Sequence, residues 1–298
     1  MPRAGTSKLI RMQDGSMDHT RPGSFTRRRA LQSLSLSAGA LLSLGLWPGC
    51  ATHRRTSGGN FRFLVINDTH YMTPECGQWL ETVVSGMNRH SDVELCLLVG
   101  DLVEKGRKEH LGAVADIFSG LRAPVYPVIG NHDYLTDTDA SAYDTLFAKR
   151  RNYRFEHRGW QFVGLDSSQG TAYEKTSIQP HTLRWLDEHT PKLDPRKPTV
   201  LFTHFPLGLD VRYRPKNADD VLDRFREFNL RAVFNGHFHG FTERTWEAAT
   251  VTTNRCCALK RGNHDRTTEM GYFLCDVRDG IVTRTFIHCE MPAPAKAA

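Results

Sequence analysis

The chain has 298 residues, of which 39% are hydrophobic and 24% are charged, a composition typical of a globular protein rather than a disordered, collagen-like or multi-span membrane chain. Five of its six net positive charges lie in residues 1–50, so the remainder is nearly neutral. The binding of a nucleic-acid backbone is largely electrostatic, and this charge distribution therefore argues against nucleic acid as a partner.

The first fifty residues predict an export signal. Residues 26–32 read TRRRALQ, and the pair Arg27-Arg28 stands directly before an uncharged stretch at residues 31–47. This is the layout of a twin-arginine signal peptide. Serine and glycine dilute the stretch, which argues against a permanent transmembrane helix. We therefore predict that the protein is exported and is periplasmic or associated with the cell envelope.

Cys50 ends this region and follows the residues LWPG. The arrangement is similar to the site at which bacterial lipoproteins are cut and lipidated, although Trp47 stands where such sites prefer an aliphatic residue. A lipid anchor at Cys50 would be the membrane link of this protein, and the alternative is cleavage nearby and release of a soluble product. The seven cysteines contain no CxxC pair, which argues against a closed structural zinc site.

Residues 59–290 are predicted to form one domain in which short apolar runs alternate with helical segments. Strands are predicted at residues 61–67, 93–99, 124–129, 161–166, 199–204 and 231–236. Helices are predicted between them at residues 75–89, 108–121, 139–149, 180–189 and 218–228. This alternation predicts an α/β fold with largely parallel sheets covered by helices. After Gly240 the pattern changes to successive strands, which would add antiparallel strands to a second sheet.

Polar motifs follow the predicted strands at the points where the strands end. They are Asp68-Thr69-His70, Gly100-Asp101, Gly130-Asn131-His132-Asp133, His204 and Gly236-His237-Phe238-His239. Each motif alone has an ordinary explanation as a turn or a helix cap. In open α/β sheets, however, ligands bind beyond the carboxyl ends of the strands. The ordered series of motifs therefore predicts one site at that edge.

The side chains of these motifs predict a metal centre. Mixed carboxylate, amide and imidazole ligands suit borderline divalent ions such as Mn, Fe, Zn or Co. Two such ions roughly 3.5 to 4 Å apart can clamp the attacking and leaving oxygens of an in-line displacement and can supply hydroxide from a bridging water near neutral pH. Hydrolysis of a phosphoester fits this chemistry.

The motif series resembles that of the calcineurin-like metallophosphoesterases, from about Phe61 to about His288. The resemblance implies a four-layer sandwich of two mixed β-sheets flanked by helices and a site for two metal ions. One metal would be bound by Asp68, His70, Asp101 and His239, and the other by Asp101, Asn131, His204 and His237. The resemblance also implies that His132 is the general acid and that Asp133 orients its ring.

The compact length and the GNHD motif resemble the group that includes the class III cyclic nucleotide phosphodiesterases. We therefore predict a metal-dependent phosphatase or phosphodiesterase that hydrolyses small-molecule phosphomonoesters or phosphodiesters by attack of the bridging hydroxide. The alternatives are a noncatalytic metal-binding scaffold on the same fold and a nuclease. None of the implied metal ligands is missing and His132 is present, which favours the enzyme over the scaffold.

Two further features lie near the predicted site in the sequence. Asp166 and Ser167 end a predicted strand and either line the site or cap a turn. A second GNHD, at residues 262–265, has no apolar strand leading into it. We predict that it is a loop in which the preceding Arg261 contacts substrate phosphate.

Overall fold

The structure, a computed structural model, describes residues 56–290. The predicted export signal, with Arg27, Arg28 and Cys50, lies outside these residues. Within the described range, no helix is both long and apolar enough to cross a membrane. The six cysteines of this range are free thiols.

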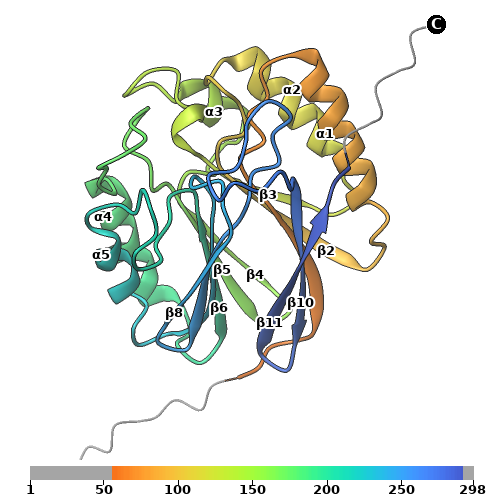
Figure 1. Cartoon of the computed structure of the whole chain (residues 1–298). Helices are drawn as coiled ribbons and strands as arrows, with labels where there is room; N and C mark the ends of the chain where they lie inside the picture. Colours follow the sequence, from red (N-terminus) through yellow and green to blue (C-terminus); the bar gives the residue numbers. More distant parts are fainter. Residues whose placement is uncertain (1–55, 291–298) are drawn as a thin grey trace, which may run out of the picture. The chain divides into compact units, whose positions relative to one another are not determined.

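Two mixed β-sheets pack face to face (Figure 1). The first has the strand order β11-β10-β1-β2-β3, and the second has the order β4-β5-β6-β7-β9-β8. The strands of the first sheet are β1 (Phe61–Ile66), β2 (Val93–Val99), β3 (Val125–Val128), β10 (Gly271–Arg278) and β11 (Ile281–His288). The strands of the second sheet are β4 (Tyr153–His157), β5 (Trp160–Leu165), β6 (Pro198–Thr203), β7 (Asn229–Asn235), β8 (Thr242–Trp246) and β9 (Ala249–Thr253).

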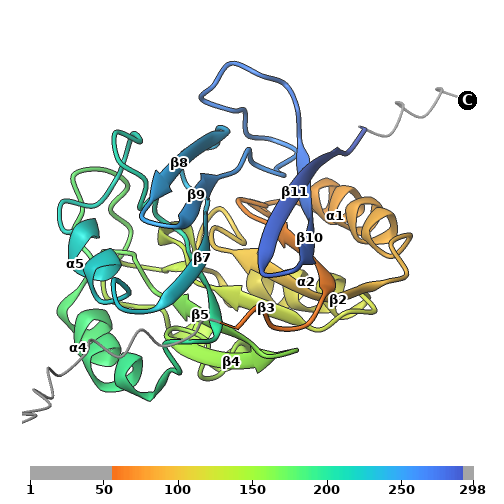
Figure 2. The same cartoon turned by 90° about the horizontal axis from the view of Figure 1, so that it is seen from below.

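Helices cover the outer faces of both sheets. The helices are α1 (Pro74–Met87), α2 (Lys108–Ser119), α3 (Ser141–Leu146), α4 (Pro180–His189) and α5 (Ala218–Asp223). Figure 2 shows α1 and α2 beside the first sheet and α4 and α5 beside the second. The predicted four-layer sandwich of two mixed β-sheets flanked by helices is therefore confirmed.

The central strands are buried on both faces, which explains their continuous apolar sequences. In β1, Phe63 faces the core between the sheets while Leu64 faces the helices. The ring of Phe63 meets Phe162 of β5 and Phe234 of β7 edge to face, with centroids 6.0 and 5.8 Å apart. An aromatic layer therefore holds the two sheets together.

The end of the chain differs from the prediction in its sheet pairing. We expected all strands after Gly240 to add antiparallel strands to a second sheet. Instead, β8 and β9 extend the second sheet, and β9 runs parallel to β7. The strands β10 and β11 return to the first sheet, where β10 pairs antiparallel with β1. A strand's own sequence does not encode which sheet it joins, because both sheets offer an edge for the same apolar face.

The other differences between the predicted and observed elements are smaller. Strand β4 was not predicted, because its buried or partly buried positions alternate with exposed ones, which include Arg154 and Glu156. Helix α5 ends at Asp223, earlier than the predicted residue 228, and α3 is shorter than predicted at both ends.

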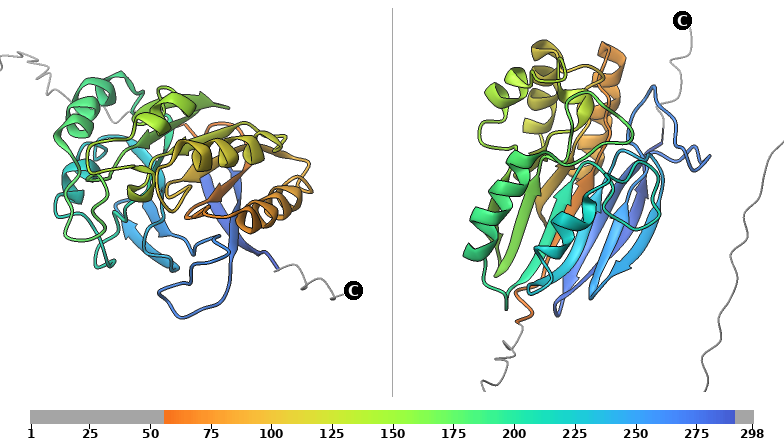
Figure 3. Two further views of the ribbon diagram at one scale, coloured as in Figure 1. Left: turned by 90° about the horizontal axis from the view of Figure 1, so that it is seen from above. Right: turned by 90° about the vertical axis from the view of Figure 1, so that its left-hand side faces the viewer.

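Parallel pairing brings the strand ends together. The strands β1, β2 and β3 run parallel, as do β5, β6 and β7. The loops that follow these strands gather at one end of the sandwich (Figure 3). This end carries the polar motifs of both sheets.

Candidate metal centre

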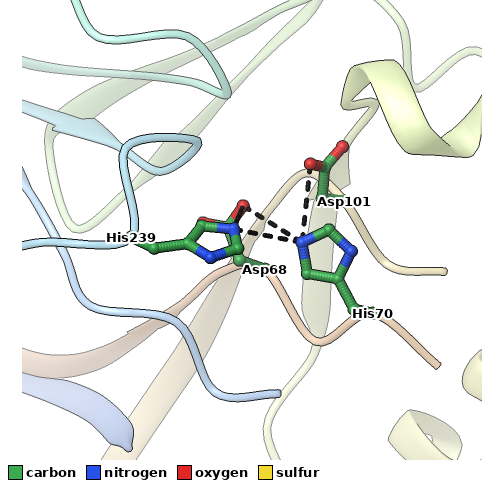
Figure 4. Close-up of side chains that lie close together, drawn as sticks. All are labelled: Asp68, His70, Asp101 and His239. Atoms are coloured by element: carbon green, nitrogen blue, oxygen red, sulfur yellow. Dashed lines mark hydrogen bonds and ion pairs between the residues drawn. The ribbon is translucent and has the colours of Figure 1, made fainter. Parts of the chain in front are cut away.

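The motifs after β1, β2 and β7 form a first cluster of potential metal ligands. The Nε2 atom of His239 lies 3.1 Å from Oδ1 of Asp68 and 3.1 Å from Nε2 of His70. Figure 4 shows the His70 ring pointing toward these groups and toward Asp101, whose Oδ2 is 3.7 Å from His70 Nε2. One ligand atom from each of the four residues lies within 4.8 Å of the others. A single cation can therefore contact all four.

A second cluster shares Asp101 with the first. The Oδ2 atom of Asp101 lies 3.1 Å from Nε2 of His204, which is 3.2 Å from Nδ1 of His237. Asn131 lines the same cleft, and its buried Oδ1 atom has no hydrogen-bond partner among the described residues. Buried polar atoms are nearly always paired, so this oxygen fits a metal ligand. The structure thus brings together all seven predicted ligands around one shared carboxylate.

The histidine tautomers also fit a metal centre. In each of the four histidines, the ring nitrogen that faces away from the cluster lies near an oxygen acceptor. These contacts are His204 Nδ1 to Val99 O (3.2 Å), His237 Nε2 to Tyr173 O (2.7 Å), His239 Nδ1 to Gly262 O (3.2 Å) and His70 Nδ1 to Glu104 Oε2 (3.1 Å). An oxygen acceptor favours a proton on the outer nitrogen. The inner nitrogen then presents its lone pair to a cation.

The backbone at the ligands is strained. Asp68, His70, Asp101, His237 and His239 have φ angles between 42° and 64°. This left-handed region costs non-glycine residues of order 1–3 kcal/mol each, and such strain is concentrated at functional sites. Sharp turns at these positions point the side chains back over the strand ends.

Two glycines allow the motifs to approach the carboxylates. A Cβ atom added to Gly130 would overlap Oδ1 of Asp101, and one added to Gly236 would overlap Oδ2 of Asp68. The glycines that precede Asn131 and His237 are therefore required by close packing against the two carboxylates.

Charges within the site keep both carboxylates ionised. Burial opposes ionisation of Asp68 and Asp101, but His239 beside Asp68 and His204 beside Asp101 hold the pKa of each below its ordinary value. Burial also lowers the pKa of His204, but the two carboxylates outweigh it and raise that pKa to about 9. Burial and the neighbouring His204 lower the pKa of His237 to about 3. Asp68 and Asp101 would supply two negative charges to a cation bound here, and binding through His204 would require that its ring nitrogen be deprotonated.

His132 lies in the same cleft, with its ring 4.8 Å from that of His70. Its Nδ1 atom is 2.9 Å from the backbone oxygen of Glu104. The prediction that Asp133 orients this ring is wrong. The buried carboxylate of Asp133 accepts hydrogen bonds from the backbone N–H groups of Gly130, Leu102 and Val103. Asp133 therefore joins the GNHD turn to the Gly-Asp turn, and Glu104 holds the histidine.

Glu104 is a site residue that the sequence analysis missed. Its carboxylate contacts Nδ1 of His70, and its Oε2 accepts a hydrogen bond from Nε of Arg261 at 3.0 Å. His70 and Arg261 hold the pKa of Glu104 at about 2, although burial opposes this shift. The only sequence signal was an acidic residue three positions after the Gly-Asp motif.

The cleft over the cluster has a volume of about 360 Å³. Besides predicted ligands and His132, it is lined by Thr171, Tyr173, Tyr213, Arg261 and His264. The second GNHD is a loop, as predicted, and it contributes His264 to the cleft.

Asp166 and Ser167 have structural roles away from the cleft lining. Asp166 accepts hydrogen bonds from the Tyr134 hydroxyl at 2.7 Å and from the Ser168 backbone N–H at 2.9 Å. The hydroxyl of Ser167 accepts the backbone N–H of Phe205. Of the two alternatives for these residues, the structure favours the turn-capping one.

The chain is similar to named phosphodiesterases. It is 28% identical over 156 residues to a 3′,5′-cyclic-nucleotide phosphodiesterase of Nostoc sp., a match that covers 50% of this chain and 56% of that enzyme. It is 31% identical over 209 residues to a probable cyclic nucleotide phosphodiesterase of Rhodopseudomonas palustris, covering 62% of this chain and 74% of that protein.

A solved structure and a family model agree with the fold. The structure of a dimetal phosphatase from Danio rerio superposes with a TM-score of 0.59 and 16% identity, covering 76% of this chain and 95% of that one. The family model of the calcineurin-like phosphoesterases matches residues 61–241, which is more than half of the chain. The match spans β1 to the GHFH motif after β7 and thus includes every predicted metal ligand. The chain therefore belongs to the calcineurin-like phosphoesterase family.

Proposed function

We propose that this protein is a binuclear metal-dependent phosphoesterase that hydrolyses small-molecule phosphodiesters. The observation that carries the proposal is the pair of ligand clusters that share Asp101. The names of the two relatives above support a diester substrate rather than a monoester. The intact ligand sets favour an enzyme over the noncatalytic scaffold.

The first cation would be held by Asp68, His70, Asp101 and His239, and the second by Asp101, Asn131, His204 and His237. Nitrogen and oxygen donors of this kind suit Mn, Fe or Zn. When bound, such ions activate water and neutralise the charge that develops on the phosphoryl group. The protein's part is to hold the ligands in place through the backbone and carboxylate contacts of their outer nitrogens.

His132 is placed to donate a proton to the departing oxygen. Its Nδ1 is occupied by the Glu104 carbonyl, and this leaves Nε2 for the cleft. The guanidinium of Arg261 is fixed by the Glu104 carboxylate and lies in the same cleft. It adds positive charge where an anionic diester would bind.

The test is turnover by purified protein that has been stripped of metal and reloaded with Mn²⁺. We expect hydrolysis of bis(p-nitrophenyl) phosphate that depends on metal, and slower hydrolysis of p-nitrophenyl phosphate. Metal content is measured on the same samples by mass spectrometry. Stoichiometric metal without turnover of either ester would support the scaffold alternative instead.

We also propose that the protein acts after export, in the periplasm or at the cell envelope. The support is the TRRRALQ segment and the uncharged stretch that follows it. A lipid anchor at Cys50 is part of this proposal and is tested by labelling with a radioactive fatty acid in cells.

A further inference from the structure

Two tyrosines form one wall of the metal cleft. Tyr173 lies in the loop between β5 and α4, and Tyr213 lies in the loop between β6 and α5. Their ring centroids are 6.5 Å apart and the rings are inclined at 66°, so together they form an aromatic corner. Tyr173 is 58% exposed, whereas the Tyr213 ring lies 5.2 Å from that of His237. An exposed aromatic surface therefore begins directly beside the predicted metal ligands.

The aromatic corner is fixed by the surrounding backbone. Three hydrogen bonds join the two loops: Lys216 N–H to Thr176 O (2.9 Å), Ile178 N–H to Asn217 Oδ1 (2.8 Å) and Asn217 Nδ2–H to Ile178 O (3.1 Å). The backbone oxygen of Tyr173 also accepts the ring N–H of His237 at 2.7 Å. The corner thus keeps its position relative to the metal centre, and little ordering is needed when a ligand binds.

A cation lies beside the same corner. The guanidinium carbon of Arg212 is 4.6 Å from the centroid of the Tyr213 ring. Arg212 is exposed, and no ion pair of Arg212 is found among residues 56–290. The Tyr213 ring also meets the His264 ring edge to face, with centroids 6.0 Å apart. The planar groups and the positive charge suit a planar, electron-rich ring.

We propose that Tyr173 and Tyr213, with Arg212, form a subsite for an aromatic group attached to the phosphodiester, such as a nucleobase. This inference rests on the proposed function and specifies its substrate class. Stacking on a tyrosine face depends little on the hydrogen-bond pattern of a base, so the subsite accepts different bases. A diester with only small aliphatic groups gains nothing from it.

The experiment compares two cyclic diesters with the same six-membered phosphate ring. Adenosine 3′,5′-cyclic phosphate carries a base, and the cyclic phosphate of 1,3-propanediol does not. Stacking is lost in Tyr173→Ala and Tyr213→Ala, so each should raise KM for the adenosine ester by about 5- to 150-fold. In each variant the rise in KM should be clearly larger for the adenosine ester than for the propanediol ester, which has no base to stack.

Matched variants separate stacking from folding. Tyr173→Phe and Tyr213→Phe keep the aromatic face and should retain the wild-type KM. Tyr213→Leu keeps an apolar side chain without an aromatic face and should raise KM for the adenosine ester as Tyr213→Ala does. It replaces Tyr213→Ala in the test if the alanine variant folds poorly. Leu209→Ala is the control in the same loop, because Leu209 is 64% exposed and is absent from the cleft lining.

A binding measurement keeps this inference separate from the proposed activity. Calorimetry with the Mn²⁺-loaded full chain compares adenosine monophosphate with inorganic phosphate. The tyrosine variants should weaken only the nucleotide, even if the wild-type protein hydrolyses neither cyclic ester. Equal changes for both ligands, or no change for the nucleotide, would overturn the aromatic subsite and leave the metal-dependent activity standing on its own test.

Discussion

Replacing His132 by alanine tests the proposed acid catalysis. The His132 side chain is 26% exposed in the cleft, and its Nδ1 is held 2.9 Å from the Glu104 carbonyl. A general acid contributes roughly 10² to 10⁴-fold where a proton must reach the leaving oxygen, equivalent to about 3–5.5 kcal/mol of transition-state stabilisation. A nitrophenolate leaves without that proton, whereas an alkoxide does not. His132→Ala should therefore lose roughly 10² to 10⁴-fold on alkyl diesters and less than about tenfold on p-nitrophenyl diesters.

The assay measures kcat/KM for two methyl diesters that differ only in the leaving group, p-nitrophenolate or an alkoxide. Metal content is measured in parallel and should stay at the wild-type level, because His132 belongs to neither predicted ligand set. His181→Ala is the matched control, since His181 has a side chain that is 43% exposed and lies outside the cleft lining. Equal losses on both diesters with metal retained would refute the acid role and would indicate that His132 stabilises charge or positions substrate.

Three further perturbations follow from the same geometry. Asp101→Ala should lower the content of both metals, because Asp101 belongs to both clusters, and the loss should exceed that of any other single ligand change. Loss of only one ion on metal analysis would argue against a shared ligand. Asp133→Ala leaves three buried backbone N–H groups without an acceptor, so urea unfolding should show a loss of roughly 3 kcal/mol or more; an unchanged midpoint would contradict the structural role. Asp133→Asn should restore only part of this loss, because its single amide oxygen can accept from Leu102 and Val103 while its Nδ2 cannot accept from Gly130. The double variant Arg27→Lys, Arg28→Lys keeps the charge and should stop export by the twin-arginine route; unchanged export in cell fractionation would point to a different signal.

The sequence alone predicted most of the strands and the seven candidate metal ligands. Continuous apolar runs identified β1, β2 and β6, because a strand buried on both faces needs apolar residues at every position. The glycine-led motifs after β3 and β7 were visible because close packing of backbone against a carboxylate excludes every other residue at Gly130 and Gly236. Both signals lie in short stretches of consecutive residues, so they can be recognised without the tertiary structure.

Only the tertiary structure decided which residues the side chains of the site contact. His132 and Asp133 are neighbours in the chain, but they lie in a single 3-10 turn at Asn131–Asp133, where successive side chains point about 120° apart. Asp133 therefore turns to the backbone of the neighbouring loop, and the ring of His132 is held by Glu104. In the same way, Tyr173 and Tyr213 come from separate loops with no motif of their own. Their meeting depends on hydrogen bonds across the two loops, and such contacts between distant segments leave no periodic pattern in the sequence.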